Sequence, residues 1–204
     1  MKKLGVLLSG RGSNFEAIAR NIADGKLKAE IAVVISNRPE APGLETARRL
    51  GLHAVALPSK GLPREEFDSQ VASILDQHNV DLVVLAGYMR LLSGAFVKHF
   101  AMRIVNIHPS LLPAFPGLDA QHQAFEYGVK IAGCTAHFVD EHLDSGPIIL
   151  QAAVAVEEAD TAETLSARIL EEEHRVYTDA IRLVLSGEWR IEGRRVVSSR
   201  MPLR

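Results

Sequence analysis

Short apolar, β-branched runs alternate with amphipathic stretches through the first two thirds of this chain, and that alternation constrains the fold more than any other feature. Each run is apolar on both faces, which is typical of a strand buried inside a parallel sheet. The predicted strands are residues 4–8, 31–35, 82–85 and 104–107, with a weaker one at 53–56, and the predicted helices between them are residues 15–24, 44–50 and 65–77. This order indicates an α/β fold, a mostly parallel open sheet with helices on both faces.

The later part of the chain has a different pattern. Residues 133–139 and 148–156 are two strand-like runs joined by a polar stretch, which predicts an antiparallel extension of the sheet. A long helix is expected from Ala162 to about Leu185, with Asp160 or Thr161 as its N-cap and Gly187 just past its end. Since no repeat, low-complexity tract or linker interrupts the chain, we predict a single domain.

The composition excludes several classes of protein. The 204 residues carry a net charge of -2, which provides no general field for nucleic acid or for an anionic membrane. Cys134 is the single cysteine, so neither an internal disulfide framework nor a multi-thiolate zinc site can form. The apolar stretches are far shorter than the about 18 residues of a membrane span, and we find no export signal. We therefore expect a cytoplasmic protein.

Arginines gather near the C-terminus of the chain. An arginine-rich arm can bind phosphate-bearing partners, but aromatic side chains do not alternate with these arginines. A solvated, partly mobile tail over residues 190–204 is therefore the favoured interpretation. The arginines are Arg190, Arg194, Arg195, Arg200 and Arg204.

A glycine turn, Ser9-Gly10-Arg11-Gly12-Ser13-Asn14, lies between the first predicted strand and the first predicted helix. Glycines let the backbone approach a ligand closely, and a helix N-terminus offers unpaired N–H groups to an anion. A dinucleotide fingerprint requires a small residue where Phe15 stands and an acidic one near Ser36, and no Gly-Lys-Ser/Thr of a P-loop follows. The turn predicts a site for a monophosphate group; a tight turn without a ligand is the alternative.

Asn106 and His108 lie at the end of a predicted central strand, ahead of the proline-rich stretch Pro109–Gly117. Because strand side chains alternate, the two polar groups point to one face at the carboxyl end of the strand, where open α/β sheets bind ligands. An amide beside an imidazole suits a reaction in which a carbonyl becomes an oxyanion and a leaving nitrogen takes up a proton. The alternative is an Asn and a His that only cap loops.

An acidic loop over residues 140–147 follows later in the chain. If Asp144 reaches His108, its carboxylate favours the imidazolium, raises the pKa of His108 and orients the ring. A metal site is a second interpretation, since His137 precedes the loop, but the spacing matches neither His-Glu-x-x-His nor an EF-hand. We therefore predict no metal. An exposed polar loop remains a further alternative.

Three segments together resemble the phosphoribosylglycinamide formyltransferases. They are Ser9–Asn14, Asn106-Ile107-His108-Pro109-Ser110-Leu111-Leu112-Pro113 and Leu143-Asp144-Ser145-Gly146-Pro147, and the similarity extends to Glu172-Glu173-His174. The resemblance implies a Rossmann-like formyltransferase domain. Residues 1–100 would bind the ribonucleotide phosphate and residues 101–190 would carry catalysis and folate binding. It also implies transfer of a formyl group from 10-formyltetrahydrofolate to the primary amine of glycinamide ribonucleotide, in purine biosynthesis.

The same resemblance implies roles for individual residues. Gly12, Ser13 and Asn14 would hold the phosphate, and Glu173 would contact the same substrate. Asn106 and His108 would stabilise the oxyanion, His108 would also be the general acid, and Asp144 would raise the pKa of His108. The implied folate-binding positions are Arg64, Met89, Arg90, Leu91, Leu92, Asn106, Val139, Asp140, Glu141, His142, Leu143 and Asp144.

The expected partners are these two small molecules, without nucleic acid or membrane, and the chain is expected to be a monomer or a homodimer. Three alternatives stay open. Methionyl-tRNA formyltransferase shares the central motif but carries an additional C-terminal domain, and formyltetrahydrofolate deformylase uses similar Asn, His and Asp residues. A phosphosugar-binding module without chemistry is the third.

Overall fold

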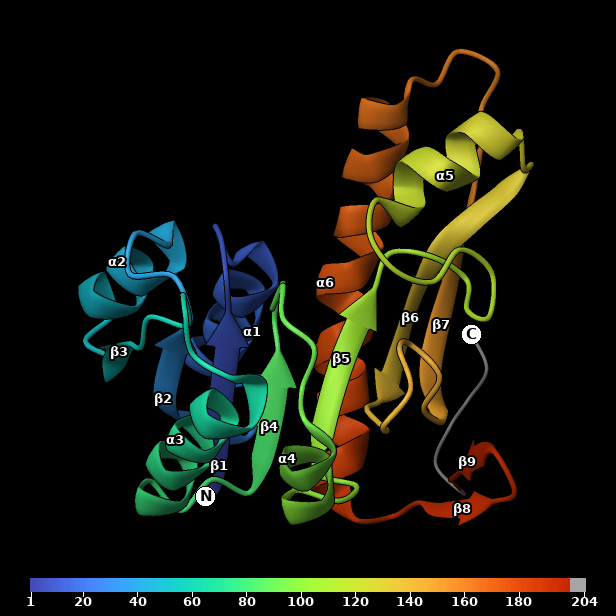
Figure 1. The fold of residues 1–204 in the computed structure, drawn as a ribbon. Coiled ribbons are helices and arrows are strands. Elements are labelled where there is room, and N and C mark those ends of the chain that lie inside the picture. Colours follow the sequence, from blue (N-terminus) through green and yellow to red (C-terminus); the bar gives the residue numbers. More distant parts are fainter. Residues whose placement is uncertain (199–204) are drawn as a thin grey trace. The chain divides into compact units, whose positions relative to one another are not determined.

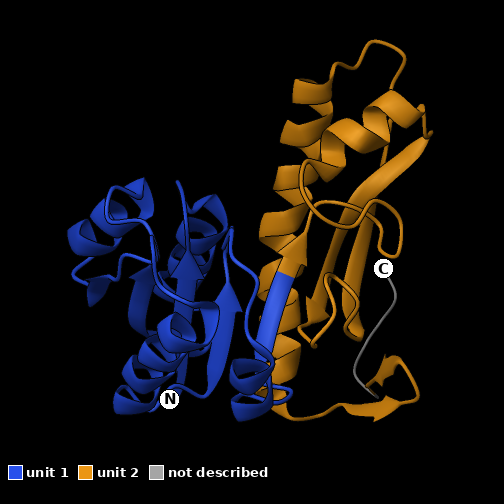
Figure 2. Ribbon diagram, in the orientation of Figure 1, with its two compact units in different colours: residues 1–106 blue, residues 107–204 orange. Residues whose placement is uncertain are grey.

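The structure is a computed structural model and describes residues 1–198 of the chain. The chain forms two compact units, residues 1–106 and residues from 107 onward, coloured separately in Figure 2.

The first unit contains the parallel sheet (Figure 1). Its strands are β1 (Lys2–Leu8), β2 (Ala29–Ser36), β3 (Ala54–Ala56), β4 (Leu82–Leu85) and residues 104–106 of β5 (Ile104–His108), in the order β3-β2-β1-β4-β5. All these neighbours pair in parallel. Val6 and Leu7, which point to opposite faces of the central strand β1, are both completely buried, which explains why its sequence is apolar on both faces.

Helices cover both faces of this sheet. They are α1 (Ser13–Ala23), α2 (Pro42–Arg49), α3 (Arg64–Gln77) and α4 (Gly94–His99). Because parallel strands are joined by right-handed crossovers, α1 and α2 lie on one face, and α3 and α4 on the other. Gly5 lets α3 pack closely on β1, since a Cβ at this position would stand 2.3 Å from Leu75 Cδ2.

The second unit contains the antiparallel extension and the long helix. β6 (Ile131–Phe138) pairs antiparallel with β7 (Ile148–Ala155), and α6 (Ala162–Ser186) packs against both. α5 (Ala120–Tyr127) packs on α6. Thr161 is the N-cap of α6 in a capping box with Thr164, and Gly187 ends the helix with a φ of 68°. The predicted fold class is confirmed in its mostly parallel sheet, its helices on both faces, its antiparallel extension and its long C-terminal helix.

Residues 190–197 differ from the predicted tail. β8 (Arg190–Glu192) and β9 (Arg195–Val197) form a hairpin through Gly193, whose φ is 63°. Such short strands have too few residues for a period, so the sequence pattern did not reveal them. Arg200 and Arg204 lie outside the described residues. Among the helices of residues 1–198, none has both the length and the apolar character that crossing a bilayer requires.

Candidate active site

The glycine turn and the segment 87–92 lie side by side at the carboxyl ends of β1 and β4. Ser9 N donates to Gly87 O at 3.1 Å, and the Ser9 hydroxyl accepts a hydrogen bond from Met89 N at 2.8 Å. The same hydroxyl donates to Asn37 Oδ1 at 2.6 Å. The strand β2 lies on one side of β1 and the strand β4 on the other, so the strand order reverses at β1. The carboxyl ends of β1 and β4 are therefore a topological switch point, where α/β sheets bind ligands.

The glycine turn has the backbone geometry of an anion site. Gly12 is the N-cap of α1 in the left-handed region, with φ 76° and ψ 39°. Ser13 and Asn14 are the first residues of that helix, where backbone N–H groups lack intrahelical acceptors and the helix dipole favours negative charge. Glycine is favoured at position 12 for two reasons. It adopts a positive φ without strain, and a Cβ there would stand only 3.2 Å from Leu8 Cδ2.

The segment after Gly87 is anchored to α3. The Arg90 guanidinium lies 4.7 Å from the centroid of the Phe67 ring and donates to Leu62 O at 3.4 Å. Ser93 N donates to the buried carboxylate of Asp68 at 2.6 Å. Met89 is 60% exposed between these anchors. An apolar, accessible surface on a fixed backbone is suited to a flat aromatic ligand.

Other residues that the resemblance assigned to folate or the ribonucleotide lie on separate elements. Arg64 is the first residue of α3 and is exposed, and Leu91 is 51% exposed. Glu173 lies on α6 in the second unit, where it is buried.

Asn106 and His108 lie on β5 two positions apart, so their side chains leave the same face of the strand. His108 is buried and Asn106 half-buried. The strand ends at His108, and the chain turns through the proline-rich segment, in which Ser110 Oγ donates to Ala114 O at 2.5 Å. This turn brings the backbone of residue 115 back to the His108 ring.

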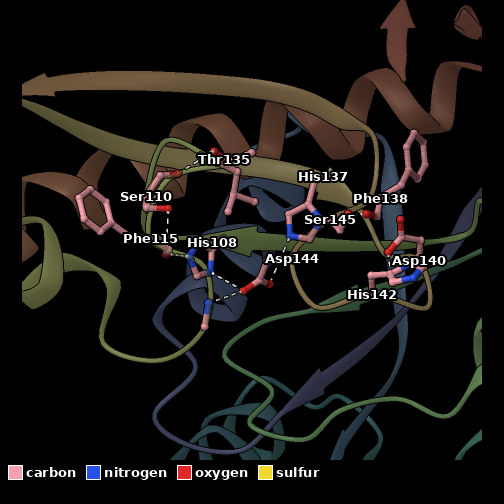
Figure 3. A network of polar contacts seen from close by, with 12 residues as sticks. His108, Ser110, Phe115, Thr135, His137, Phe138, Asp140, His142, Asp144 and Ser145 are labelled. Atoms are coloured by element: carbon pink, nitrogen blue, oxygen red, sulfur yellow. Dashed lines mark hydrogen bonds and ion pairs between the residues drawn. The ribbon is translucent and has the colours of Figure 1, made fainter. Parts of the chain in front are cut away.

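The His108 ring is held between two acceptors (Figure 3). Its Nε2 lies 2.8 Å from Phe115 O, and its Nδ1 lies 3.4 Å from Asp144 Oδ2. A backbone carbonyl can only accept a hydrogen bond, so Nε2 carries a proton. The Asp144 carboxylate offers a second acceptor, on the Nδ1 side of the ring.

The structure places Asp144 against His108, although the two residues come from distant parts of the sequence. Asp144 has a positive φ of 48°, and its side chain is 10% exposed. Its Oδ2 accepts a hydrogen bond from Gly117 N at 2.8 Å, and its Oδ1 lies 3.8 Å from His137 Nε2. Figure 3 shows the carboxylate between the two imidazole rings. The carboxylate thus faces both rings and is fixed in place by the backbone of Gly117.

The acidic loop is closed at its base by backbone contacts. Phe138 N donates to Pro147 O at 2.9 Å, and a Cβ at Gly146 would stand 1.8 Å from Phe138 O, so only glycine fits there. Farther out, His142 N donates to Asp140 Oδ1 at 2.9 Å. The predicted folate-binding residues Glu141, His142 and Leu143 are exposed at the loop tip, and Val139 and Asp140 are half-buried near its start.

His137 contributes a second, neutral imidazole to this cluster. Its Nδ1 donates to Phe138 O at 2.8 Å, and burial lowers the pKa of His137 below its ordinary value of 6.5, with smaller effects from Asp144, His108 and Asp140. The neutral ring packs beside the charged pair. Within the part of the chain that is described, no three His, Cys, Asp or Glu side chains are arranged to hold a metal ion.

Replacing His137 by asparagine should make the stability of the protein less dependent on pH. In the wild type, the unfolded chain takes up a proton at His137 as the pH falls below 6.5, whereas the folded chain resists it, so the free energy of unfolding decreases. The slope from this one group is at most about 1.4 kcal/mol per pH unit. Urea unfolding between pH 7.5 and 5.5 measures it, with His142→Asn at an exposed position as the control. Equal slopes for His137→Asn and the wild type would contradict the expectation.

Two supporting residues were missed by the sequence analysis. Thr135 Oγ1 donates to Ser110 O at 2.7 Å and accepts from Leu112 N at 3.0 Å. Gln151 Nε2 donates to Thr135 Oγ1 at 2.9 Å and to Leu112 O at 3.0 Å. These bonds fix the segment that follows His108. A signal existed for Thr135, because a polar residue on an otherwise apolar strand needs a buried partner.

The glycine turn at the N-terminus of α1 and the His108–Asp144 contact are each features that enzymes on α/β scaffolds use. The sequence identifies the class of the protein, since the Formyl transferase family matches residues 2–181, and the chain belongs to that family. A phosphoribosylglycinamide formyltransferase of Bacillus subtilis (strain 168) is 43% identical over 186 residues, covering 91% of this chain and 95% of that protein.

Solved structures and longer proteins are also similar. The crystal structure of glycinamide ribonucleotide transformylase 1 from Symbiobacterium toebii superposes with a TM-score of 0.94 at 55% identity, covering 97% of this chain and 94% of that one. The trifunctional purine biosynthetic protein adenosine-3 of Gallus gallus is 47% identical over 91% of this chain, which spans only 18% of that protein.

Proposed function

We propose that this protein transfers the formyl group of 10-formyltetrahydrofolate to the primary amine of glycinamide ribonucleotide. The observation that carries the proposal is the buried contact between His108 Nδ1 and Asp144 Oδ2, at 3.4 Å, at the carboxyl end of β5. A relative with this activity in its name covers nearly the whole chain, which supports the same assignment.

The chemistry requires an oxyanion and a proton transfer. The neutral amine attacks the formyl carbon, a C–N bond forms, and negative charge develops on the formyl oxygen. Asn106 and the His108 imidazolium are the donors for that oxygen. The bond from the formyl carbon to the folate nitrogen then breaks, that nitrogen takes a proton, and the attacking amine loses one. His108 is the general acid in this exchange.

The contact of His108 Nε2 with Phe115 O must yield for the ring to reach a substrate. The Phe115 carbonyl is a neutral acceptor of a hydrogen bond, whereas the Asp144 carboxylate is a charged group 3.4 Å from Nδ1. A buried charge attracts the ring more strongly than a neutral carbonyl does. The Nε2–H is therefore the donor released toward the substrate, while Asp144 retains Nδ1. Under this mechanism the carboxylate stabilises the charge and fixes the orientation of the ring.

The binding residues follow from the two ligands. Gly12, Ser13 and Asn14 would hold the ribonucleotide phosphate at the N-terminus of α1, and Glu173 would contact the same substrate. The folate would lie on Met89–Leu92 and the acidic loop Val139–Asp144, with Arg64 at its carboxylate end. The exposed apolar side chains of Met89 and Leu91 support this placement.

A steady-state assay with both substrates tests the proposal. We expect loss of 10-formyltetrahydrofolate that depends on glycinamide ribonucleotide and yields the formylated ribonucleotide. Release of formate without the acceptor would instead identify a deformylase. Tight binding of both ligands without turnover would identify a binding module, and either result would overturn the proposal.

A further inference from the structure

The segment that follows α6 contacts both ends of the acidic loop. At the start of the loop, the Trp189 ring packs on Phe138, with ring centroids 4.8 Å apart. At its end, the Arg194 guanidinium donates a hydrogen bond to Ser145 O, directly after Asp144. All these residues belong to the second unit. The β8–β9 hairpin with Trp189 therefore bounds the loop on two sides.

The hairpin is itself fixed to elements outside the loop. Trp189 Nε1 donates to Val184 O at 3.0 Å, near the end of α6. β9 pairs in parallel with β7, through Arg195 and Ile148, the first residue of β7. β8 and β9 then pair with each other. The hairpin is thus anchored on a helix and a strand, and it can act as a support against which the loop rests.

The base of the loop connects Phe138, which the Trp189 ring contacts, to the segment that carries Asp144. Both backbone polar groups of Phe138 form hydrogen bonds. Its N–H donates to Pro147 O, and its carbonyl accepts from His137 Nδ1. Gly146 packs so closely on that carbonyl that no side-chain atom fits between them. Asp144, in its left-handed conformation, lies between these contacts and depends on its surroundings to stay there.

From these contacts we infer that the C-terminal hairpin, through Trp189 and Arg194, is a positioning element that holds Asp144 against His108. Neither residue touches the catalytic pair. Both lie beyond residue 181, where the match to the family ends. For its effect on turnover, the inference rests on the proposed function.

The test uses the full chain and compares two exposed arginines of one hairpin. Arg194→Ala removes the bond to Ser145 O. Arg190→Ala removes the same charge from a guanidinium that pairs with Glu192 within the hairpin, at 2.8 Å, and is the matched control. Trp189→Ala removes the contact with Phe138, and Arg194→Lys retains a cationic donor. Thermal unfolding of each variant checks that it remains folded.

Two measurements separate positioning from general packing. We expect kcat to fall about tenfold in Arg194→Ala, because small misplacements of catalytic groups have large effects on rate, with partial recovery in Arg194→Lys. The NMR chemical shifts of the His108 ring nitrogens should change in Arg194→Ala and Trp189→Ala, because the carboxylate is held less closely. Arg190→Ala should match the wild type in both.

The outcomes are distinct for the two proposals. Wild-type chemical shifts of the His108 ring in both Arg194→Ala and Trp189→Ala would overturn the positioning role, and so would a lower kcat without any change in those chemical shifts. A folded wild-type protein that does not transfer formyl groups would overturn the proposed function. The NMR arm would still decide the role of the hairpin, because it requires no turnover.

Discussion

Replacing His108 by alanine should lower kcat for formyl transfer about 10³-fold, while the KM for either substrate changes little. Loss of one oxyanion donor typically costs about 10²–10³ in rate, and loss of a general acid about 10²–10⁴. The two effects belong to one side chain here, so they do not simply multiply. Steady-state kinetics with both substrates varied gives kcat and KM separately.

A second His–Asp pair in the chain provides a matched control for this variant. His99 Nε2 lies 2.8 Å from Asp76 Oδ2, but the two side chains are 49% and 53% exposed, at the surface of the first unit. His99→Ala removes an imidazole from a similar pair and should leave kcat unchanged. If His108→Ala turned over at a rate near that of His99→Ala, His108 would have no part in the mechanism.

Replacing Asp144 by asparagine should lower kcat about 10- to 100-fold. The amide has nearly the same shape and can still accept the hydrogen bond from Gly117 N, but it carries no charge. Under the proposed mechanism His108 carries positive charge while it donates to the oxyanion, and a carboxylate stabilises that charge where an amide does not.

Steady-state kinetics with both substrates measures this effect directly. Asp76→Asn is the control, because it makes the same change in a His–Asp pair at the surface of the first unit, where solvent screens the charge. Its kcat should match that of the wild type. A kcat of Asp144→Asn near that of Asp76→Asn would separate the carboxylate from the chemistry of the ring.

Burial made the main strands predictable. Residues 82–85 were expected as a strand and form β4 with the same bounds. Leu82 and Val84 are buried within a parallel sheet, and a buried position requires an apolar side chain, so the sequence shows the strand directly. The short helices α4 and α5 were not predicted, since they contain too few turns for a helical period. The β8–β9 hairpin was mistaken for a tail for the same reason.

The candidate site was predictable only where side-chain identity carries the signal. Asn106 and His108 were found because an amide and an imidazole are unusual at the end of a buried strand. The carbonyl of Phe115 and the N–H of Gly117 were not, because every backbone offers a carbonyl and almost every one an N–H group. Only the path of the chain decides which of them meets His108 or Asp144.

The sequence by itself determined the alternation of strands and helices, the glycine turn and the polar residues at the end of β5, because these are properties of neighbouring residues. The tertiary structure alone decided that Asp144 lies against His108, that His137 is a neutral neighbour and that Trp189 and Arg194 contact the acidic loop. The physical reason is that each of these contacts joins residues far apart in the chain. Their distance is set by the packing of whole elements, which no local pattern of residues records.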